Sequence, residues 1–284
     1  MPIHARSTRT TGHSQRADLQ PRLLLNRTVD GNAYIWLIDL ERRGALTRIT
    51  TAPTPDIAPR WSSSGRQIYY GGRGGAGFAI LTRPPTAAAT DETVFDSPDN
   101  DIPMDVSRDG RFLLFRRQRA SPANVDIFVL SLTGDKAPTA IAATDADERG
   151  AAFSPDGRWI AFESNESGHF DIFVQPFLRP GERTLLSPGG GTQPRWGPSG
   201  DEVYYVARDG RLMAVQLRMA PDGSALQPAS PKALFPSRLN TTAAGGSSTE
   251  YVVALDGKRF LLNTQVEYAN APITLVLNMG TPRN

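Results

Sequence analysis

The stretch AFSPDGRWIAFES, residues 152–164, places a serine, a proline, an aspartate and a glycine between two short apolar runs. Proline presets φ for the first central position of a tight turn, aspartate bonds back to the main chain, and glycine adopts the left-handed conformation that many hairpins need. Short apolar runs separated by such residues are typical of paired antiparallel strands. The stretch therefore predicts a β-hairpin.

This hairpin pattern recurs along the chain. Its copies are PRWSSSGRQIYY from Pro59, MDVSRDGRFLLF from Met104, AAFSPDGRWIAF from Ala151, PRWGPSGDEVYY from Pro194 and VVALDGKRFLL around Gly257. Their glycines lie at positions 65, 110, 157, 200 and 257, at intervals of 45, 47, 43 and 57 residues. An apolar side chain stands four residues before each glycine, and another stands three residues after it. Such a spacing indicates a repeat architecture.

Each copy is followed by further apolar runs that predict a third and a fourth strand. The third strands are expected at FAILT from Phe78, DIFVL from Asp126, DIFVQ from Asp171, RLMAV from Arg211 and ITLVL from Ile273. Fourth strands are expected at RTLLS from Arg183 and KALFP from Lys232. Short strands punctuated by Gly, Pro and Asp predict four-stranded antiparallel meanders.

Meanders of this size are too small to bury a core alone, so each unit must stack its faces on its neighbours. Closing the stack into a ring limits exposed edges and gives a β-propeller. Trp61 and Trp196 would fill the gaps between blades, because large aromatic side chains contribute much buried area. The sequence therefore predicts an all-β fold, a β-propeller with six blades.

The first of the six blades is expected to be incomplete. The segment PRLLLNRTVDGNAYIWLIDL, from Pro21, matches only the second and third strands of a unit, and HSQRA at residues 13–17, where the first strand should fall, is almost without apolar side chains. We expect a propeller over residues 21–284 and a disordered basic tail over residues 1–20. Either the ring closes in an unusual way, or the chain is the C-terminal part of a longer protein whose other residues complete the ring.

Composition narrows the possible partners. Thirty-one basic and 29 acidic residues leave a net charge of +2, too small for a dedicated nucleic-acid or membrane-surface binder. The absence of cysteine excludes disulfides, Cys-ligated zinc and thiol nucleophiles. No segment has the apolar length of a secretory signal or of a membrane span. We expect a monomer without membrane insertion, and the composition leaves the compartment open.

Several of these segments carry a resemblance to a known family. WSSSGRQIYY, FSPDGRWIAFESNESGHFDIFV and PRWGPSGDEVYY resemble the TolB-like propellers, also called PD40 or WD40-like, over roughly residues 21–284. GRLMAVQL, PKALFP, LDGKRFLLNT and PITLVLN are similar to the C-terminal propellers of bacterial serine/threonine protein kinases and winged-helix regulators. The resemblance implies a six-bladed propeller for protein contacts or sensing, often outside the cytoplasmic membrane and tethered to an effector domain.

The sequence contains no recognisable catalytic set. The HRD and DFG motifs of a kinase and the GxSxG elbow of a hydrolase are absent, and only three histidines exist to serve as a general base. The glycine-rich GGRGGAGF from Gly71 joins two expected strands and opens no helix, so a phosphate-binding loop is not predicted. We expect a protein that is not an enzyme and that needs no cofactor.

Candidate binding residues come from the loops between blades. Asp56, Asp101 and Glu148 lie five residues before their apolar anchors, and we expect them near the channel mouth on the face opposite the SPDG turns. His169 lies in the loop between the second and third strands of its blade, on the same expected rim. Aspartates in loops commonly cap turns. The other possibilities are a partner's basic segment or a calcium-like cation, which requires six to eight converging oxygens.

The basic run of Arg116, Arg117 and Arg119 is expected in a solvated loop after FLLF, because it lacks the aromatic platforms of single-strand binders. The favoured function is a non-enzymatic scaffold or sensor that binds a protein or peptide on the rim of inter-blade loops. The alternative is the sensory domain of a kinase or transcription regulator whose effector is absent from this chain. A metal-assisted enzyme site in the channel is a third hypothesis.

Overall fold

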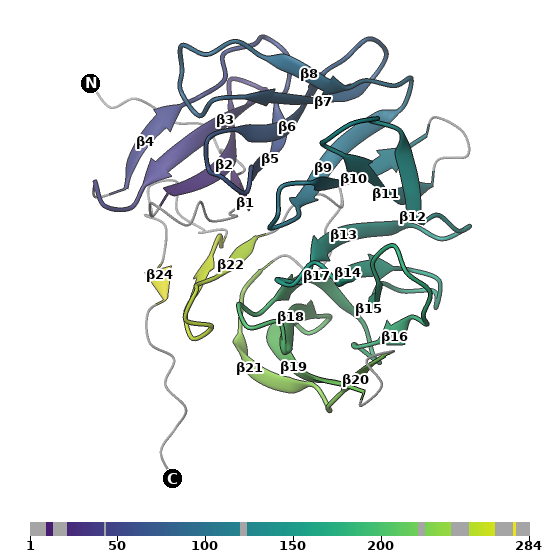
Figure 1. Cartoon of the computed structure of the whole chain (residues 1–284). Coiled ribbons are helices and arrows are strands. Elements are labelled where there is room, and N and C mark those ends of the chain that lie inside the picture. The colour runs from purple at the N-terminus through teal and green to yellow at the C-terminus, as the bar shows by residue number, and fades with distance from the viewer. Residues whose placement is uncertain are drawn as a thin grey trace.

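The protein is a ring of small β-sheets arranged around a common axis (Figure 1), and we call the region at this axis the channel. The computed structural model describes residues 10–13, 22–42, 44–119, 124–220, 225–239, 250–264 and 275–276. Within these residues the chain forms six antiparallel sheets, called blades 1 to 6 in chain order. No helix in the described part of the chain is long and apolar enough to cross a membrane.

In five of the six blades each described strand pairs with the next one along the chain, and blade 5 departs from this order only at its last strand. Blade 1 contains β1 (Thr10–His13), β2 (Arg22–Val29), β3 (Asn32–Asp39) and β4 (Ala45–Arg48). Blade 2 contains β5 (Ile57–Trp61), β6 (Ile68–Arg73), β7 (Phe78–Arg83) and β8 (Glu92–Phe95). Blade 3 contains β9 (Asn100–Val106), β10 (Phe112–Gln118), β11 (Val125–Ser131) and β12 (Pro138–Ala142).

The second half of the ring follows the same plan. Blade 4 contains β13 (Glu148–Phe153), β14 (Trp159–Ser164), β15 (Asp171–Pro176) and β16 (Thr184–Leu185). Blade 5 contains β17 (Gly191–Trp196), β18 (Glu202–Ala207), β19 (Arg211–Met219), β20 (Leu226–Pro228) and β21 (Lys232–Pro236), the last two both pairing with β19. Blade 6 contains β22 (Tyr251–Val253), β23 (Phe260–Leu262) and β24 (Leu275–Val276).

The innermost strand of each blade contacts the innermost strands of its two neighbours. The contacts run from β1 to β5, β9, β13, β17 and β22, and β22 contacts β1 again (Figure 1). The ring is therefore closed by β1 and β22 lying side by side. The all-β, six-bladed prediction is confirmed.

Blade 1 differs from the prediction in its first strand. Residues 10–13 form β1, which pairs with β2 from Thr10 opposite Arg27 to His13 opposite Leu24. The expectation of an incomplete first blade and of an unstructured tail through residue 20 is therefore wrong at these four residues. The physical reason is that strand pairing uses main-chain hydrogen bonds, which a segment of few apolar side chains makes as well as any other. The rest of the expected tail lies outside the described residues.

The repeated turn has a common hydrogen-bond pattern. In blade 4 the Ser154 carbonyl accepts the Gly157 N–H at 2.9 Å, and the Ser154 hydroxyl oxygen accepts the Trp159 N–H at 2.9 Å. Asp156 accepts the Arg158 N–H at 3.0 Å, and Gly157 has a φ of 68°. Ser154, Asp156 and Gly157 thus each stabilise the turn, as their residue types predict.

The core lies between the blades, as the sequence predicts. Trp61 is 1% exposed and packs with Leu24 and Ile35 of blade 1. Trp196 is 8% exposed and packs against Trp159 of blade 4, and its indole N–H donates to the Ala152 carbonyl at 3.1 Å. The apolar residue before each turn glycine therefore fastens one blade to the preceding one.

The innermost strands share an irregularity. Ala58, Gly150 and Gln193 have φ of 53°, 65° and 60°, and the ladder register shifts at each of these places. A bulge turns main-chain groups out of the ladder. A side chain of the preceding blade accepts the N–H in two cases: Asn26 Oδ1 for Ala58 at 2.8 Å and Glu163 Oε1 for Gln193 at 2.7 Å.

Candidate functional site

The three acids expected on the inter-blade rim are buried. Asp56, Asp101 and Glu148 are 2%, 0% and 0% exposed. Asp101 accepts two hydrogen bonds from Arg117, at 2.8 and 3.2 Å, and Glu148 accepts the Thr144 N–H at 3.3 Å. The structure thus assigns Asp101 and Glu148 to internal hydrogen bonds and not to a free acidic rim. For Glu148 this bond agrees with the turn-capping alternative, and a ligand-binding role for the three acids stays a prediction.

Asp56 is the least satisfied of these acids. Its Oδ2 has no hydrogen-bond partner in the described part of the chain. Burial raises the pKa of Asp56 to about 6, and the Thr50 hydroxyl, Arg83 and Arg48 partly offset this increase. Burial likewise raises the pKa of Glu148, with Thr144 opposing the shift. Both groups are buried acids of the blade interfaces.

His169 is the one sequence candidate that stays partly accessible, with a side chain 36% exposed. Its Nε2 lies 3.2 Å from Asp171 Oδ2. Asp171 also accepts the Gly190 N–H at 3.0 Å and the Ser167 hydroxyl at 2.7 Å. The arrangement ties a loop together. Nowhere in the described residues do three His, Asp or Glu side chains converge as metal ligands.

The arginine run after FLLF is not a solvated loop. Arg116 and Arg117 belong to β10, and Arg119 follows it. The Arg117 side chain is 14% exposed, pairs with Asp101 and lies 4.7 Å from the ring centroid of Phe128. The predicted loop is wrong for Arg116 and Arg117, which lie in the strand, and Arg117 has carboxylate and aromatic partners that only the folded sheet brings together.

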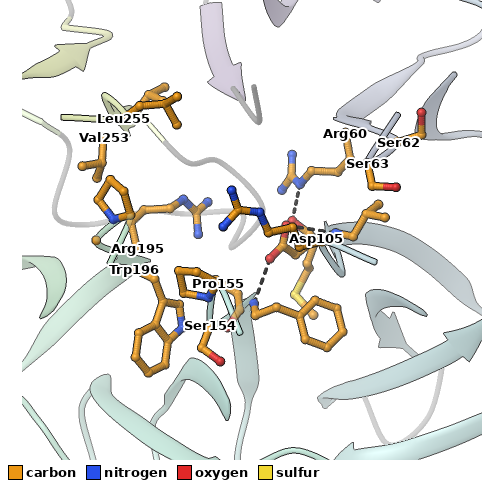
Figure 2. A pocket seen from close by; sticks show the side chains of 18 residues that line it. Arg60, Ser62, Ser63, Asp105, Ser154, Pro155, Arg195, Trp196, Val253 and Leu255 are labelled. Atoms are coloured by element: carbon orange, nitrogen blue, oxygen red, sulfur yellow. Dashed lines mark hydrogen bonds between the residues drawn. The ribbon is translucent and has the colours of Figure 1, made fainter. Parts of the chain in front are cut away.

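A pocket opens at the other end of the channel, on the face that carries the SPDG turns (Figure 2). It has a volume of about 270 Å³ and is lined by residues of blades 2 to 6. We call it the channel pocket. The pocket is open to solvent, because three of its lining residues are exposed: Ser63, Arg108 and Leu255.

Three charged side chains of the inner strands reach the channel pocket: Arg60 of β5, Asp105 of β9 and Arg195 of β17. Each stands five residues before its turn glycine, next to the apolar anchor. Because neighbouring side chains of a strand point to opposite faces, the anchor packs against the preceding blade and the charged residue faces the following one. Figure 2 shows Arg60 and Arg195 entering the pocket from opposite walls.

The hydrogen bonds of these three residues hold their positions. Arg60 donates through Nε to the Met104 carbonyl and through Nη1 to the Pro59 carbonyl at 3.0 Å. Arg195 donates to the Pro194 carbonyl at 2.7 Å. Asp105 accepts the N–H of Val106 at 2.9 Å and that of Phe153 at 2.8 Å.

Burial perturbs all three groups. It lowers the pKa of the Arg60 guanidinium well below its usual range, and the charge of Arg195 lowers it further. Burial also lowers the pKa of Arg195, against the influence of Tyr251 and Asp105. Burial raises the pKa of Asp105 to about 6, with the Phe153 N–H and the two arginines opposing the shift.

The remaining wall of the channel pocket is largely apolar. Phe153 and Trp196 are 7% and 8% exposed, and Val253 and Leu255 of blade 6 also line the pocket, Leu255 being 51% exposed. Such a combination of a few fixed polar groups with apolar walls is typical of ligand pockets.

Sequence reasoning missed Arg60, Asp105 and Arg195, although two of them are printed in the PRW motifs that predicted the blades. The two-residue period of a strand could have revealed them. A charged residue next to a buried anchor points to the opposite face of its strand, and its recurrence in several inner strands places these charges near the axis of the ring. What the sequence does not show is that blades 2, 3 and 5 bring these positions together.

Comparison with known proteins supports the fold. No protein-family model matches the chain, and no curated protein sequence matches it. Among solved structures, a putative TolB from Agrobacterium tumefaciens superposes with a TM-score of 0.59 and 19% identity, over 80% of this chain and 83% of that one. The chain has the fold of a TolB-like propeller.

Other propellers superpose on this TolB-like propeller with similar scores. TolB from Acinetobacter baumannii matches with a TM-score of 0.57 and 18% identity, over 81% of this chain and 57% of that one. An oligogalacturonate lyase from Vibrio parahaemolyticus matches with a TM-score of 0.53 and 11% identity, over 89% and 87%. Similar structures therefore include both a lyase and proteins named TolB. At these identities the likeness concerns the fold alone.

Proposed function

We propose that this TolB-like propeller is a non-catalytic binding module whose protein or peptide partner inserts a segment into the channel pocket. The observation that carries the proposal is the pocket itself: about 270 Å³, open at the turn face, with two arginines and one aspartate fixed on an apolar wall. A rigid ring that displays a few fixed groups at its axis suits recognition of a small protruding segment.

The face that carries the SPDG turns, here called the turn face, is favoured as the binding face over the inter-blade face because its charged groups have fewer partners within the protein. On the inter-blade face the carboxylates of Asp101 and Glu148 are buried and hydrogen-bonded within their own loops. In the channel pocket the printed hydrogen bonds of Arg60 and Arg195 go to main-chain carbonyls among the described residues, and both side chains line the open volume. Only the second arrangement leaves directional donors for a partner.

The test is a selection of peptides from a random display library on the wild-type protein, followed by binding to two variants. Ser63→Trp places a bulky side chain at the exposed edge of the channel pocket, whereas Asp135→Trp changes an exposed residue that does not line the pocket. We expect selected peptides to bind Ser63→Trp at least about tenfold more weakly and Asp135→Trp unchanged. Equal binding to all three proteins would place the partner elsewhere and refute the proposal.

A second candidate function is a sensory domain joined to a kinase or a transcription regulator. It is favoured by the segments GRLMAVQL and LDGKRFLLNT, which resemble propellers of that kind. Reading the coding DNA upstream of Met1 discriminates: an in-frame kinase or winged-helix domain would support the sensory role, and an immediate stop codon with a ribosome-binding site would remove it. Either outcome is compatible with a ligand in the channel pocket.

A further inference from the structure

Among the described residues, no carboxylate lies within ion-pair distance of the two arginines of the channel pocket. Within the described residues neither Arg60 nor Arg195 forms an ion pair, in contrast to Arg117 and Arg149, which pair with Asp101 and Glu163 at 2.8 Å. Arg60 is 4% exposed, and Arg195 is half-buried. Buried charges in proteins are normally paired. These two guanidinium groups are exceptions within one pocket.

Asp105 compensates at most one of the two positive charges. Both of its carboxylate oxygens accept main-chain N–H groups, from Val106 and Phe153. Counting the three inner-strand side chains, two arginines and one aspartate leave a formal charge of +1 at the inner end of the pocket, and Arg108 adds a further positive charge at its exposed edge. The described lining residues therefore give the inner end of the pocket a net charge of +1.

Arginine does not relieve this imbalance by losing its proton, because the guanidinium stays charged in proteins. An anion placed between Arg60 and Arg195 would relieve their mutual repulsion and use their free N–H groups. A planar carboxylate suits the fork of donors that a guanidinium presents.

We propose that the channel pocket binds a peptide carboxylate, held by Arg60 and Arg195, with the neighbouring apolar side chain of the peptide against Trp196, Val253 and Leu255. The inference rests on the proposed binding function and specifies its ligand. A monoanion completes the charge balance of the inner end. A phosphate dianion would add a second negative charge beside Asp105 and would leave the apolar wall unused.

The experiment uses four probes in calorimetric titrations at low ionic strength. N-acetyl-leucine carries a chain-end carboxylate, acetyl-leucyl-glutamate amide carries only a side-chain carboxylate, N-acetyl-leucinamide has no charge, and inorganic phosphate has no apolar group. We expect one or both carboxylate probes to bind at least about tenfold more tightly than the leucinamide and than phosphate, as charge-assisted hydrogen bonds require. The stronger of the two carboxylate probes identifies the source of the carboxylate.

Arg195→Gln is the decisive variant, with Arg211→Gln as the control, because Arg211 is an exposed residue of the same blade outside the pocket. Arg195→Gln should weaken carboxylate binding by roughly tenfold or more, and its Tm should stay equal or rise, since an unpaired charge is removed. Arg211→Gln should bind as the wild type does. A purely structural arginine would instead lower the Tm when replaced, and that result would overturn the assignment.

The outcomes separate this inference from the proposed function. If the leucinamide or phosphate binds as tightly as the carboxylates, or Arg195→Gln binds like the wild type, the carboxylate assignment is wrong while the pocket remains a binding site. If no probe binds but selected peptides are lost on Ser63→Trp, the carboxylate assignment is again wrong and the binding function stands. If selected peptides are indifferent to Ser63→Trp, both fail.

Discussion

Replacing Gly150 by alanine should cost far more than the backbone conformation explains. Gly150 lies in the bulge of β13 with φ +65°, and an added Cβ would come within 2.5 Å of Glu163 Oε1 and 3.0 Å of its Cδ. The end of a glutamate side chain usually moves aside. Here it is 4% exposed, accepts the Gln193 N–H at 2.7 Å and pairs with Arg149 at 2.8 Å, so that displacement would break the link between blades 4 and 5.

The magnitude follows from two contributions. A left-handed alanine costs about 1–2 kcal/mol. Losing one charged hydrogen bond at a buried site costs about 1.5–3 kcal/mol more. Gly150→Ala should therefore lower the free energy of unfolding by about 2.5–5 kcal/mol. Gly157→Ala is the matched control, because Gly157 has φ +68° and nothing within 4 Å of the added Cβ, and it should lose only the first contribution.

Urea unfolding of both variants, followed by far-ultraviolet circular dichroism, measures the difference directly. In a Glu163→Ala background the additional loss caused by Gly150→Ala should shrink to the value of Gly157→Ala, because the crowded group is gone. Equal destabilisation by the two glycine substitutions in the wild-type background would refute the role assigned to Glu163.

Three further outcomes are expected. Arg117→Met should lower the free energy of unfolding by about 3–5 kcal/mol, because it leaves Asp101 buried without a counter-charge. Arg111→Met breaks an exposed pair with Asp109 and should change this free energy by at most about 1 kcal/mol in the same urea titration. Equal losses in the two variants would contradict this prediction. Because the pKa of Asp56 is raised from 3.8 to about 6 in the folded protein, its ionisation destabilises the fold above pH 6 and not below pH 4. The unfolding free energy of Asp56→Asn relative to the wild type should therefore rise by up to about 3 kcal/mol between these limits. For Asp109→Asn the change in unfolding free energy relative to the wild type should lie below pH 4 instead, since the pKa of Asp109 is lowered to about 2, mainly by the Ser107 hydroxyl. An unfolding free energy of Asp56→Asn that stays constant relative to the wild type across this pH range would contradict the burial of the Asp56 charge.

The repeat was predictable because each turn carries its own chemistry. Ser154, Asp156 and Gly157 bond within a few residues of one another, so the pattern that stabilises the hairpin is readable locally. The anchor tryptophans are equally readable, since a large apolar residue at a fixed distance from the turn must be buried between blades. These local signals suffice for the fold and the number of blades.

The site was less predictable for two reasons. The sequence around a carboxylate before an inner strand is the same whether the group is exposed or buried. The partner that decides the matter for Asp101 is Arg117, which becomes a neighbour only when the strands pair. The strand at residues 10–13 was not predicted, because strand pairing uses main-chain groups and needs few apolar side chains.

The channel pocket required distances between blades. Arg60, Asp105 and Arg195 are 45 and 90 residues apart in the chain, and only the closed ring places them around one volume. Their common place in the repeat is visible in the sequence, but their shared surroundings are not.

The most direct measurement is a crystal structure of the propeller with a peptide selected on the wild-type protein. The peptide should lie at the turn face, with a carboxylate between the guanidinium groups of Arg60 and Arg195 and an apolar side chain against Trp196. Density for the peptide on the inter-blade face, with the channel pocket filled only by water, would contradict the account.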